Sequence, residues 1–331
     1  MPRSALSTRG SDIGILTYAY GHARFMQQAI AMAQSAKRFN PGLALACVTD
    51  DTMHTGLNQW FDVLIPYNPS FGSNLRQKLF FDKYTPFQET LFIDSDCLLT
   101  GPLDELVLQC RHRSFAVLGY PIENGWWYMD VAQAIAKYNL EYIPRFNGGF
   151  YYFQQNPESA WVFNKARQIG RIHTRMRIYE LGEWFNEEVF YAIALAAARI
   201  EPILDVQREG MYTPDQFQDP FHIDILAGEI SFPYQGVVHR PRVVHFFGHH
   251  VRTFHYLRER IKLRLRYDRR WATILITGVS AILNVAYFAF VKLYQLISLL
   301  RGKHIRFRST MPLVPFSSYF TTISKRFFPA G

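Results

Sequence analysis

Residues Glu89 to Asp104 read ETLFIDSDCLLTGPLD, in which an apolar segment, Leu91–Ile93, runs into two aspartates one residue apart. Residues i and i+2 of a strand point the same way, so Asp94 and Asp96 can aim at one point at a strand end. Two converging carboxylates repel each other unless a proton or a cation lies between them. An isolated pair of this kind also fits an acidic cap of a strand, but the apolar strand before it favours a cation site.

Apolar segments that predict strands alternate with helical patterns in the first third of the chain. Phe25–Phe39 carries apolar residues at helical spacing, and Leu75–Tyr84 also reads as a helix. Strands that alternate with helices predict an α/β fold with a mostly parallel sheet flanked by helices. The predicted strands are Ile13–Tyr18, Leu43–Val48, Phe61–Ile65 and Leu91–Ile93.

Ligands of such sheets bind at the carboxyl ends of the parallel strands. Short polar and aromatic stretches follow three of the predicted strands, so we expect a nucleotide to bind at this edge of the sheet. The expected contacts are Thr17, Tyr18, Ala19, Tyr20, Asp50, Asp94, Ser95 and Asp96.

The charge of the chain is unevenly spread. Its 331 residues are 49% hydrophobic, which excludes a disordered protein, and carry a formal net charge of +9. Eight basic residues and two acidic ones fall between Arg252 and Arg270. A basic block beside an apolar run favours an anionic membrane surface as partner and argues against nucleic acid. Free thiols in a reducing compartment are expected from the spacing of Cys47, Cys97 and Cys110, and the polar Met1–Ser11 shows no secretory signal.

The end of the chain is hydrophobic. Trp271–Val291 holds no charged residue over 21 positions, and the apolar run continues to residue 300. This length can span a bilayer, but basic residues on both sides do not orient a single span. A helix lying in the membrane interface and a buried core helix remain open. We expect a catalytic domain over 1–255 and a basic, membrane-associated helical tail over 256–331, with its hydrophobic run at 271–300.

Four features follow one another along the chain, from about residue 12 to residue 250. They are the strand and turn Ile13–Gly21, Lys78 sixteen residues before Asp94, the motif Leu91–Asp96, and Phe146–Gly149 followed by His245–Gly248. Together they resemble the retaining, metal-dependent glycosyltransferases of the glycogenin and lipopolysaccharide-galactosyltransferase type. That family has the GT-A fold, a Rossmann-like mixed sheet flanked by helices.

The resemblance implies a metal site. Asp94, Asp96 and His245 would coordinate Mn²⁺ (or Mg²⁺), which would bind the diphosphate of a nucleotide sugar, usually a UDP-sugar. A divalent cation stabilises the charge that develops on a diphosphate leaving group. A histidine ligand favours Mn²⁺ over Mg²⁺. The implied reaction is transfer of the sugar to an acceptor hydroxyl with retained configuration, either on one face or through a covalent intermediate.

Further donor contacts are implied by the same resemblance. Lys78 would lie near the donor sugar or phosphate, although it also fits an ordinary solvated helix lysine. Asn147, Gly148 and Gly149 would lie near the donor sugar, although the glycines also fit a turn that needs unusual dihedrals.

Glu187 and Glu188 stand where the family usually has Asp-Gln, a pair that contacts the sugar hydroxyls and the reacting carbon. The acidic residue is kept and the glutamine is not. Two acids in the first turn of a helix also favour its dipole without any catalytic role. We expect Glu187, Asn147 and Lys78 to be the catalytic residues.

One position departs from the family pattern. The family follows H-F-x-G with a lysine that holds the phosphate, and here Val251 occupies that place. Gly248 is expected at the donor, and His249, His250 or Arg252 could replace the lysine. Arg252 is preferred because its side chain is always charged.

The acceptor surface is expected within Glu123–Asp130. Trp126 and Trp127 offer faces on which sugars stack, with Asp130 beside them, although both tryptophans also fit core residues. A cytosolic donor and a hydrophobic tail together predict a membrane-linked or cell-envelope glycan or lipid acceptor at the cytoplasmic side of a bacterial inner membrane.

Two rival functions remain. A metal-dependent nucleotidyltransferase would carry a glycine-rich, basic phosphate loop after its first strand, which the turn Ala19–His22 does not match. A catalytically inactive membrane-bound scaffold of the same fold would explain Val251 and Glu188, but not the intact Asp94, Asp96 and His245.

Overall fold

The computed structural model describes residues 12–176, 186–205, 209–214, 221–234 and 236–265, together with six single positions between 278 and 293. The chain divides into two units. The first contains Met1–Tyr212 and Arg242–His245, and the second contains Thr213–Pro241 and Phe246–Gly331. The domain boundary expected after residue 255 stays a prediction.

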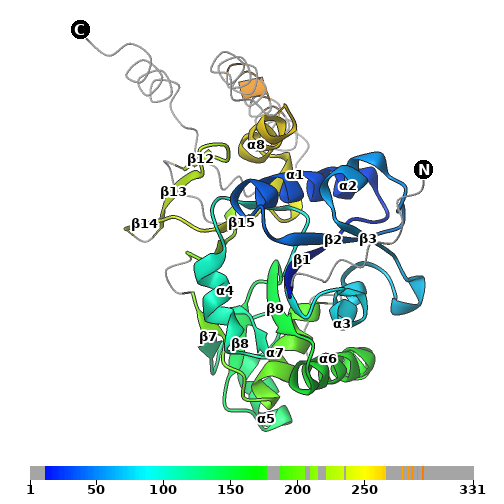
Figure 1. The fold of residues 1–331 in the computed structure, drawn as a ribbon. Helices are drawn as coiled ribbons and strands as arrows, with labels where there is room; N and C mark the ends of the chain where they lie inside the picture. The colour runs from blue at the N-terminus through cyan, green and yellow to red at the C-terminus, as the bar shows by residue number, and fades with distance from the viewer. Residues whose placement is uncertain are drawn as a thin grey trace. The chain divides into compact units, whose positions relative to one another are not determined.

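A six-stranded mixed sheet forms the centre of the first unit, in the order β3-β2-β1-β4-β9-β6 (Figure 1). The four strands from β3 to β4 run parallel, and β9 is antiparallel to its neighbours β4 and β6. The predicted α/β class, a mostly parallel mixed sheet flanked by helices, is therefore confirmed. The strands are β1 (Ile13–Tyr18), β2 (Ala44–Thr49), β3 (Val63–Pro66), β4 (Glu89–Ile93), β6 (Phe115–Ala116) and β9 (Phe150–Gln154).

The strand order reverses between β1 and β4. The chain builds outward from β1 through β2 to β3, and then returns to place β4 on the other side of β1. Ligands of open α/β sheets bind in the crevice at the carboxyl ends of the strands that flank such a reversal. Asp94 follows the end of β4, and Tyr18 ends β1, so both lie at this point.

Helices cover both faces of this sheet because successive strand residues point to opposite sides. Ile15, Leu45 and Leu91 pack into a buried cluster with α1 (Ala23–Phe39) and α4 (Asp104–Arg111). Residues of the opposite face pack with α3 (Phe81–Tyr84), α6 (Pro157–Met176) and α7 (Glu187–Ala197) (Figure 1). Their strand members include Leu16, Val48, Phe92, Tyr151 and Phe153.

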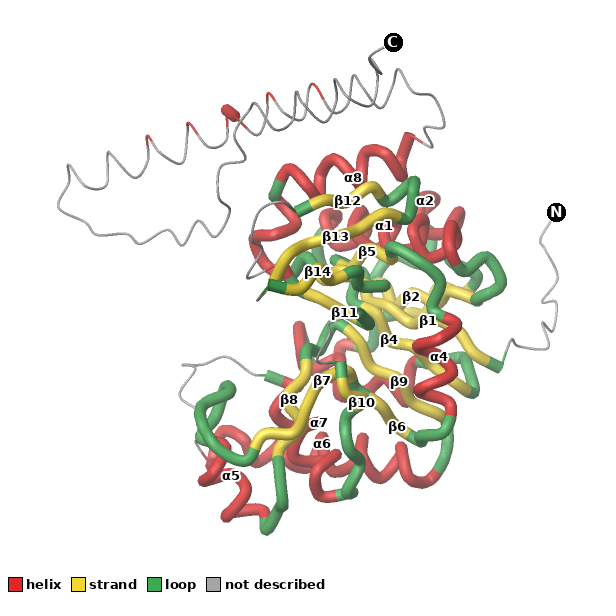
Figure 2. The backbone as a smooth tube through the Cα atoms, turned by 90° about the vertical axis from the view of Figure 1, so that its left-hand side faces the viewer, coloured by secondary structure: helices red, strands yellow, loops and turns green. Residues whose placement is uncertain are grey.

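A short three-stranded sheet carries the last strand of the first unit. β15 (Val243–His245), labelled in Figure 1, pairs antiparallel with β5 (Cys97–Leu99) and parallel with β11 (Met211–Tyr212), both labelled in Figure 2. The turn Asp94–Asp96 therefore connects the central sheet to this small one. Other elements of the unit are α2 (Thr55–Trp60), η1 (Pro69–Phe71), η2 (Asn74–Phe80), β7 (Leu118–Ile122), α5 (Val131–Tyr138), β8 (Ile143–Phe146) and β10 (Ile203–Leu204).

The second unit contains an antiparallel sheet of β12 (His222–Asp224), β13 (Glu229–Tyr234) and β14 (Val237–His239), followed by η4 (Gly248–Arg252) and α8 (Phe254–Leu265). A buried ion network joins α8 to this sheet. Glu259 accepts the Ile225 N–H at 2.8 Å, and Lys262 Nζ lies 3.1 Å from Asp224. Arg258 and Lys262 are buried, so these two of the eight basic residues do not add to a surface charge.

Most of the predicted tail lies outside the described residues, including residues 266–277 and 294–331. Six positions within the expected hydrophobic run, 278, 282, 285, 286, 289 and 293, are helical and exposed. Within the described residues, no helix combines the length and the apolar character needed to cross a bilayer.

Candidate metal and donor site

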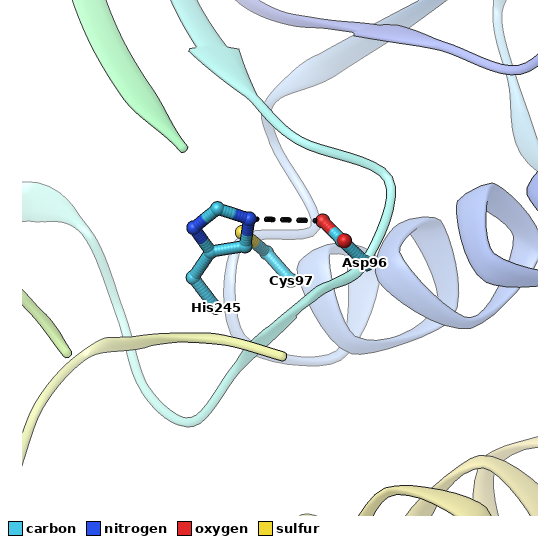
Figure 3. Close-up of side chains that lie close together, drawn as sticks. All are labelled: Asp96, Cys97 and His245. Carbon is cyan, nitrogen blue, oxygen red and sulfur yellow. Dashed lines mark ion pairs between the residues drawn. The ribbon is translucent and has the colours of Figure 1, made fainter. Parts of the chain in front are cut away.

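The turn between β4 and β5 brings the three predicted metal ligands together. The Asp94 N–H bonds to the Gly149 carbonyl at 3.0 Å, and the Cys97 N–H closes the turn onto the Asp94 carbonyl at 3.0 Å. From β15, His245 Nε2 lies 3.1 Å from Asp96 Oδ1 and 3.6 Å from Asp94 Oδ2 (Figure 3 shows the shorter contact). Two carboxylates and one imidazole nitrogen therefore converge at the predicted strand end.

The charges at this point favour a positive group between the carboxylates. Burial alone would lower the pKa of His245, but the Asp96 and Asp94 carboxylates together outweigh burial and raise it. Burial would likewise raise the pKa of Asp96, but His245 lowers it. Carboxylate oxygen and imidazole nitrogen are also ligands of Mn²⁺ and Mg²⁺ sites. The residues present therefore fit a divalent cation as well as a proton.

Asn147 fixes the orientation of the His245 ring. Asn147 Oδ1 accepts the Gly149 N–H at 2.9 Å and lies 2.7 Å from His245 Nδ1. The Gly149 N–H identifies this atom as the amide oxygen, which can only accept, so His245 Nδ1 must be the donor and Nε2 is left turned toward Asp96. A hydrogen bond of this kind sets the tautomer of a metal-binding histidine. Asn147 thus orients His245, a contact that the sequence did not indicate, and its catalytic and donor roles stay predictions.

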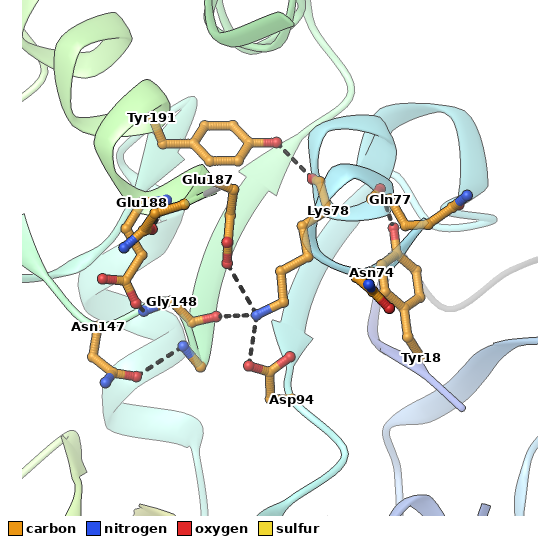
Figure 4. A network of polar contacts seen from close by, with 12 residues as sticks. Tyr18, Asn74, Gln77, Lys78, Asp94, Asn147, Gly148, Glu187, Glu188 and Tyr191 are labelled. Atoms are coloured by element: carbon orange, nitrogen blue, oxygen red, sulfur yellow. Dashed lines mark hydrogen bonds and ion pairs between the residues drawn. The ribbon is translucent and has the colours of Figure 1, made fainter. Parts of the chain in front are cut away.

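Lys78, on η2, links Asp94 to Glu187 of α7 through buried ion pairs. Its Nζ lies 2.6 Å from Asp94 Oδ2, 3.2 Å from Glu187 Oε1 and 3.0 Å from the Gly148 carbonyl (Figure 4). Burial alone would lower the pKa of Lys78, but Asp94 and then Glu187 outweigh burial and raise it. Lys78 is therefore a fixed buried cation rather than a solvated helix lysine.

Two tyrosines hold the backbone around Lys78. The Tyr191 hydroxyl, from α7, donates to the Lys78 carbonyl at 2.8 Å, and the Tyr18 hydroxyl donates to the Gln77 carbonyl at 2.9 Å (Figure 4). Both side chains are buried in the core. The cation is consequently held on a segment that is anchored on two sides.

Glu188 contacts the same glycine as Lys78, but at its N–H rather than at its carbonyl. Its Oε1 accepts the Gly148 N–H at 2.6 Å, and its own N–H bonds to the Asn186 side chain that caps α7. Burial, and then the charge of Glu187, raise the pKa of Glu188 to about 8. The raised pKa favours the neutral acid form of Glu188, which can donate a hydrogen bond as a glutamine amide does.

Gly148 and Gly149 are required by space. A Cβ at Gly148 would lie 2.9 Å from Glu188 Oε1, and one at Gly149 would lie 2.5 Å from His245 Nδ1. Neither glycine has a positive φ, so the turn dihedrals considered from the sequence are not the reason. Close packing against the acidic and imidazole groups is the reason.

Two of the residues expected at the strand ends, Tyr20 after β1 and Asp50 after β2, make aromatic and polar contacts at this edge of the sheet. Tyr20 stacks on Tyr67 with ring centroids 4.4 Å apart and donates its hydroxyl to the Asn74 carbonyl at 2.9 Å. Asp50 accepts the Gly21 N–H at 2.8 Å. The sequence did not indicate the contact with Tyr67, because a lone tyrosine after a strand carries no signal. Three other expected donor contacts in this part of the fold are buried: Thr17, Ala19 and Ser95.

The three predicted acceptor residues lie in different environments. Trp126 is 58% exposed, whereas Trp127 is 7% exposed and packs against Phe146. Asp130 caps α5 by accepting the Gln133 N–H at 3.0 Å. Of the two tryptophans, only Trp126 offers an open aromatic face, and the acceptor role of all three residues stays a prediction.

Gly248 and the exposed Arg252 lie in the second unit, and their donor role also stays a prediction.

Comparison with known proteins gives no match to a protein family and no curated protein of similar sequence. Among solved structures, the chain is similar to the galactosyltransferase LgtC in complex with donor and acceptor sugar analogs. The identity is 12% and the TM-score 0.46, over 71% of this chain and 87% of that one. Mouse xyloside xylosyltransferase 1 is 10% identical, with a TM-score of 0.44 over 70% of this chain and 97% of that one. The bifunctional glycosyltransferase WbbM is 11% identical, with a TM-score of 0.47 over 80% of this chain and 51% of WbbM.

Proposed function

We propose that this chain is a GT-A-type glycosyltransferase that moves a sugar from a UDP-sugar to an acceptor hydroxyl with retention of configuration, assisted by Mn²⁺ or Mg²⁺. One observation carries the proposal: His245 Nε2 meets Asp96 at 3.1 Å and Asp94 at 3.6 Å, at the reversal of a parallel sheet. A binding crevice is expected at such a reversal.

Asp94, Asp96 and His245 would hold the cation. A bound divalent ion neutralises the charge that builds on the diphosphate leaving group. Asn147 turns His245 Nε2 toward the site, and Lys78 holds Asp94 through a 2.6 Å ion pair. These residues thereby keep their geometry before a donor arrives, which lowers the reorganisation that the reaction needs.

Glu187 and Glu188 are proposed to contact the donor sugar from the first turn of α7. Glu187 is paired with Lys78 at 3.2 Å, and the raised pKa of Glu188 favours its protonated form. Neither carboxylate is therefore a strong nucleophile, which favours reaction on one face over a covalent intermediate. The bond from the anomeric carbon to the phosphate oxygen breaks, the acceptor oxygen bonds to the same face, and its proton passes to the leaving phosphate.

The acceptor is proposed to be a membrane-linked or cell-envelope glycan or lipid. The exposed indole of Trp126 supports a sugar-stacking surface. The uncharged run 271–291 beside basic residues supports a tail that holds the enzyme at the cytoplasmic side of a bacterial inner membrane. Sedimentation of the full chain with anionic and with neutral vesicles tests this part separately from catalysis.

The rival functions fit the site less well. An inactive scaffold has no need for a buried lysine that spans Asp94 and Glu187, because unused buried charge destabilises a fold. A nucleotidyltransferase needs a phosphate loop after β1, and the turn there carries no basic side chain before Arg24 other than His22.

A UDP-release assay tests the proposed function. The full-length, detergent-solubilised protein is given a panel of UDP-sugars with Mn²⁺ or with EDTA. We expect Mn²⁺-dependent release from one donor and a loss of at least about 100-fold in Asp96→Ala. The exposed Asp104→Ala serves as the matched control and should keep the wild-type rate. Release that is unaffected by EDTA or by Asp96→Ala would overturn the proposal.

A further inference from the structure

Cys97 faces the same point as the proposed metal ligands. The β5–β15 ladder pairs Cys97 directly with His245. Side chains of directly paired residues lie on the same face of a sheet, with Cβ atoms about 5 Å apart. Asp96 immediately precedes Cys97. The sulfur lies beside the imidazole ring, and the Asp96 carboxylate lies within 4.8 Å of it (Figure 3).

The three side chains have the spacing of a metal site. One ligand atom each from Asp96, Cys97 and His245 lies within 4.8 Å of the others. Ligand atoms around a tetrahedral ion with bonds of about 2.0–2.3 Å are roughly 3.3–3.8 Å apart. A movement of about 1 Å therefore brings all three into contact with one ion. Within the described residues, no second group of this kind occurs.

We propose that Asp96, Cys97 and His245 bind a thiophilic divalent cation, such as Zn²⁺, Co²⁺ or Cd²⁺, and that this cation competes with Mn²⁺. The competition follows because Asp96 and His245 belong to both ligand sets. The binding itself stands without the proposed function, and only the competition rests on it.

The ligand atoms determine which metal ions the site prefers. A sulfur ligand favours zinc and softer ions, whereas Mn²⁺ favours carboxylate oxygen. The Cys97 thiol lies 3.9 Å from the Gly149 carbonyl, to which its S–H points. A thiophilic ion replaces that S–H proton, which leaves to the solvent, and forms a metal–sulfur bond. The sequence alone suggested a free thiol here, since the three cysteines have no metal-like spacing.

Cobalt is the direct probe, because a cobalt–thiolate bond produces a near-ultraviolet charge-transfer band. The full chain is titrated with Co²⁺ beside Cys97→Ser, Cys97→Ala and the control Cys110→Ser, another buried cysteine. We expect the band in wild type and in Cys110→Ser, and its loss in both Cys97 variants. Zn²⁺ affinity should fall by at least about 10-fold in the Cys97 variants.

Competition is read from the electron paramagnetic resonance signal of free Mn²⁺, which should rise as Zn²⁺ is added to the Mn²⁺-loaded wild type. A missing band in wild type, or a band that survives in both Cys97 variants, overturns the proposal. A Cys97-dependent band without turnover of any donor would support this site and overturn the proposed glycosyltransferase function. Mn²⁺-dependent UDP release without the band would support the proposed function and overturn this site.

Discussion

Asn147 Oδ1 lies 2.7 Å from His245 Nδ1 and also accepts the Gly149 N–H at 2.9 Å. The replacement Asn147→Ala removes the acceptor that holds the ring. We expect Mn²⁺ affinity to fall by about 10- to 100-fold, the usual effect of losing such a partner. Titration calorimetry measures it, with the exposed Asn58→Ala as control. Equal affinities in the two variants would show that packing alone orients His245.

Lys78 compensates two buried carboxylates, so its removal should destabilise the fold. In Lys78→Met, Asp94 and Glu187 lose their shared cation, and we expect a loss of about 3–5 kcal/mol in the free energy of unfolding. Urea denaturation measures it. The more exposed Lys83→Met should lose less than about 1 kcal/mol. Adding Glu187→Gln to Lys78→Met should restore part of the loss, and strictly additive effects would contradict a coupled pair.

Glu188 makes stability depend on pH. Its pKa is about 8 in the fold against 4.5 as the ordinary value, so the folded state holds this proton more tightly. The associated stability is complete below pH 4.5 and is lost as the pH rises toward 8. Glu188→Gln removes this loss.

The melting temperature of Glu188→Gln relative to wild type should therefore rise between pH 5 and pH 9, equivalent to roughly 1–4 kcal/mol. The exposed Glu158→Gln should show no such trend. A difference that is constant across this pH range would mean that Glu188 is already ionised at neutral pH.

Gly149 has no room for a side chain. A Cβ there would lie 2.5 Å from His245 Nδ1, so Gly149→Ala must displace the ring. We expect an unfolding free energy lower by about 1–3 kcal/mol and a clear loss of Mn²⁺ affinity. Gly42→Ala is the control, since nothing lies within 4 Å of its added Cβ. Unchanged Mn²⁺ binding in Gly149→Ala would place the histidine outside the metal site.

The strand end at Asp94–Asp96 could be predicted because the signal is local: an apolar segment followed by acids. The pairing of His245 with Cys97 could not, because short strands far apart in sequence carry no register that a pattern reveals. The two tryptophans show the same limit. Trp126 and Trp127 are adjacent and chemically equal, and only the packing against Phe146 decides which of them is buried.

Lys78 illustrates a further gap. Its position sixteen residues before Asp94 is visible in the sequence, but its contact with Glu187 depends on how α7 packs. The strength of the Lys78–Glu187 ion pair depends on burial, which residue spacing does not encode. The raised pKa of Glu188 could not be predicted for the same reason.

β15 belongs to the first unit although the segments before and after it, Thr213–Pro241 and Phe246–Gly331, belong to the second. During synthesis, domains fold from the N-terminus as the chain emerges. The central sheet and the Asp94–Asp96 turn can form early, but His245 reaches the ribosome exit only after the segment 213–241. A nascent or prematurely terminated chain thus lacks His245, so under the proposed function its metal site would be incomplete and it would not turn over a donor.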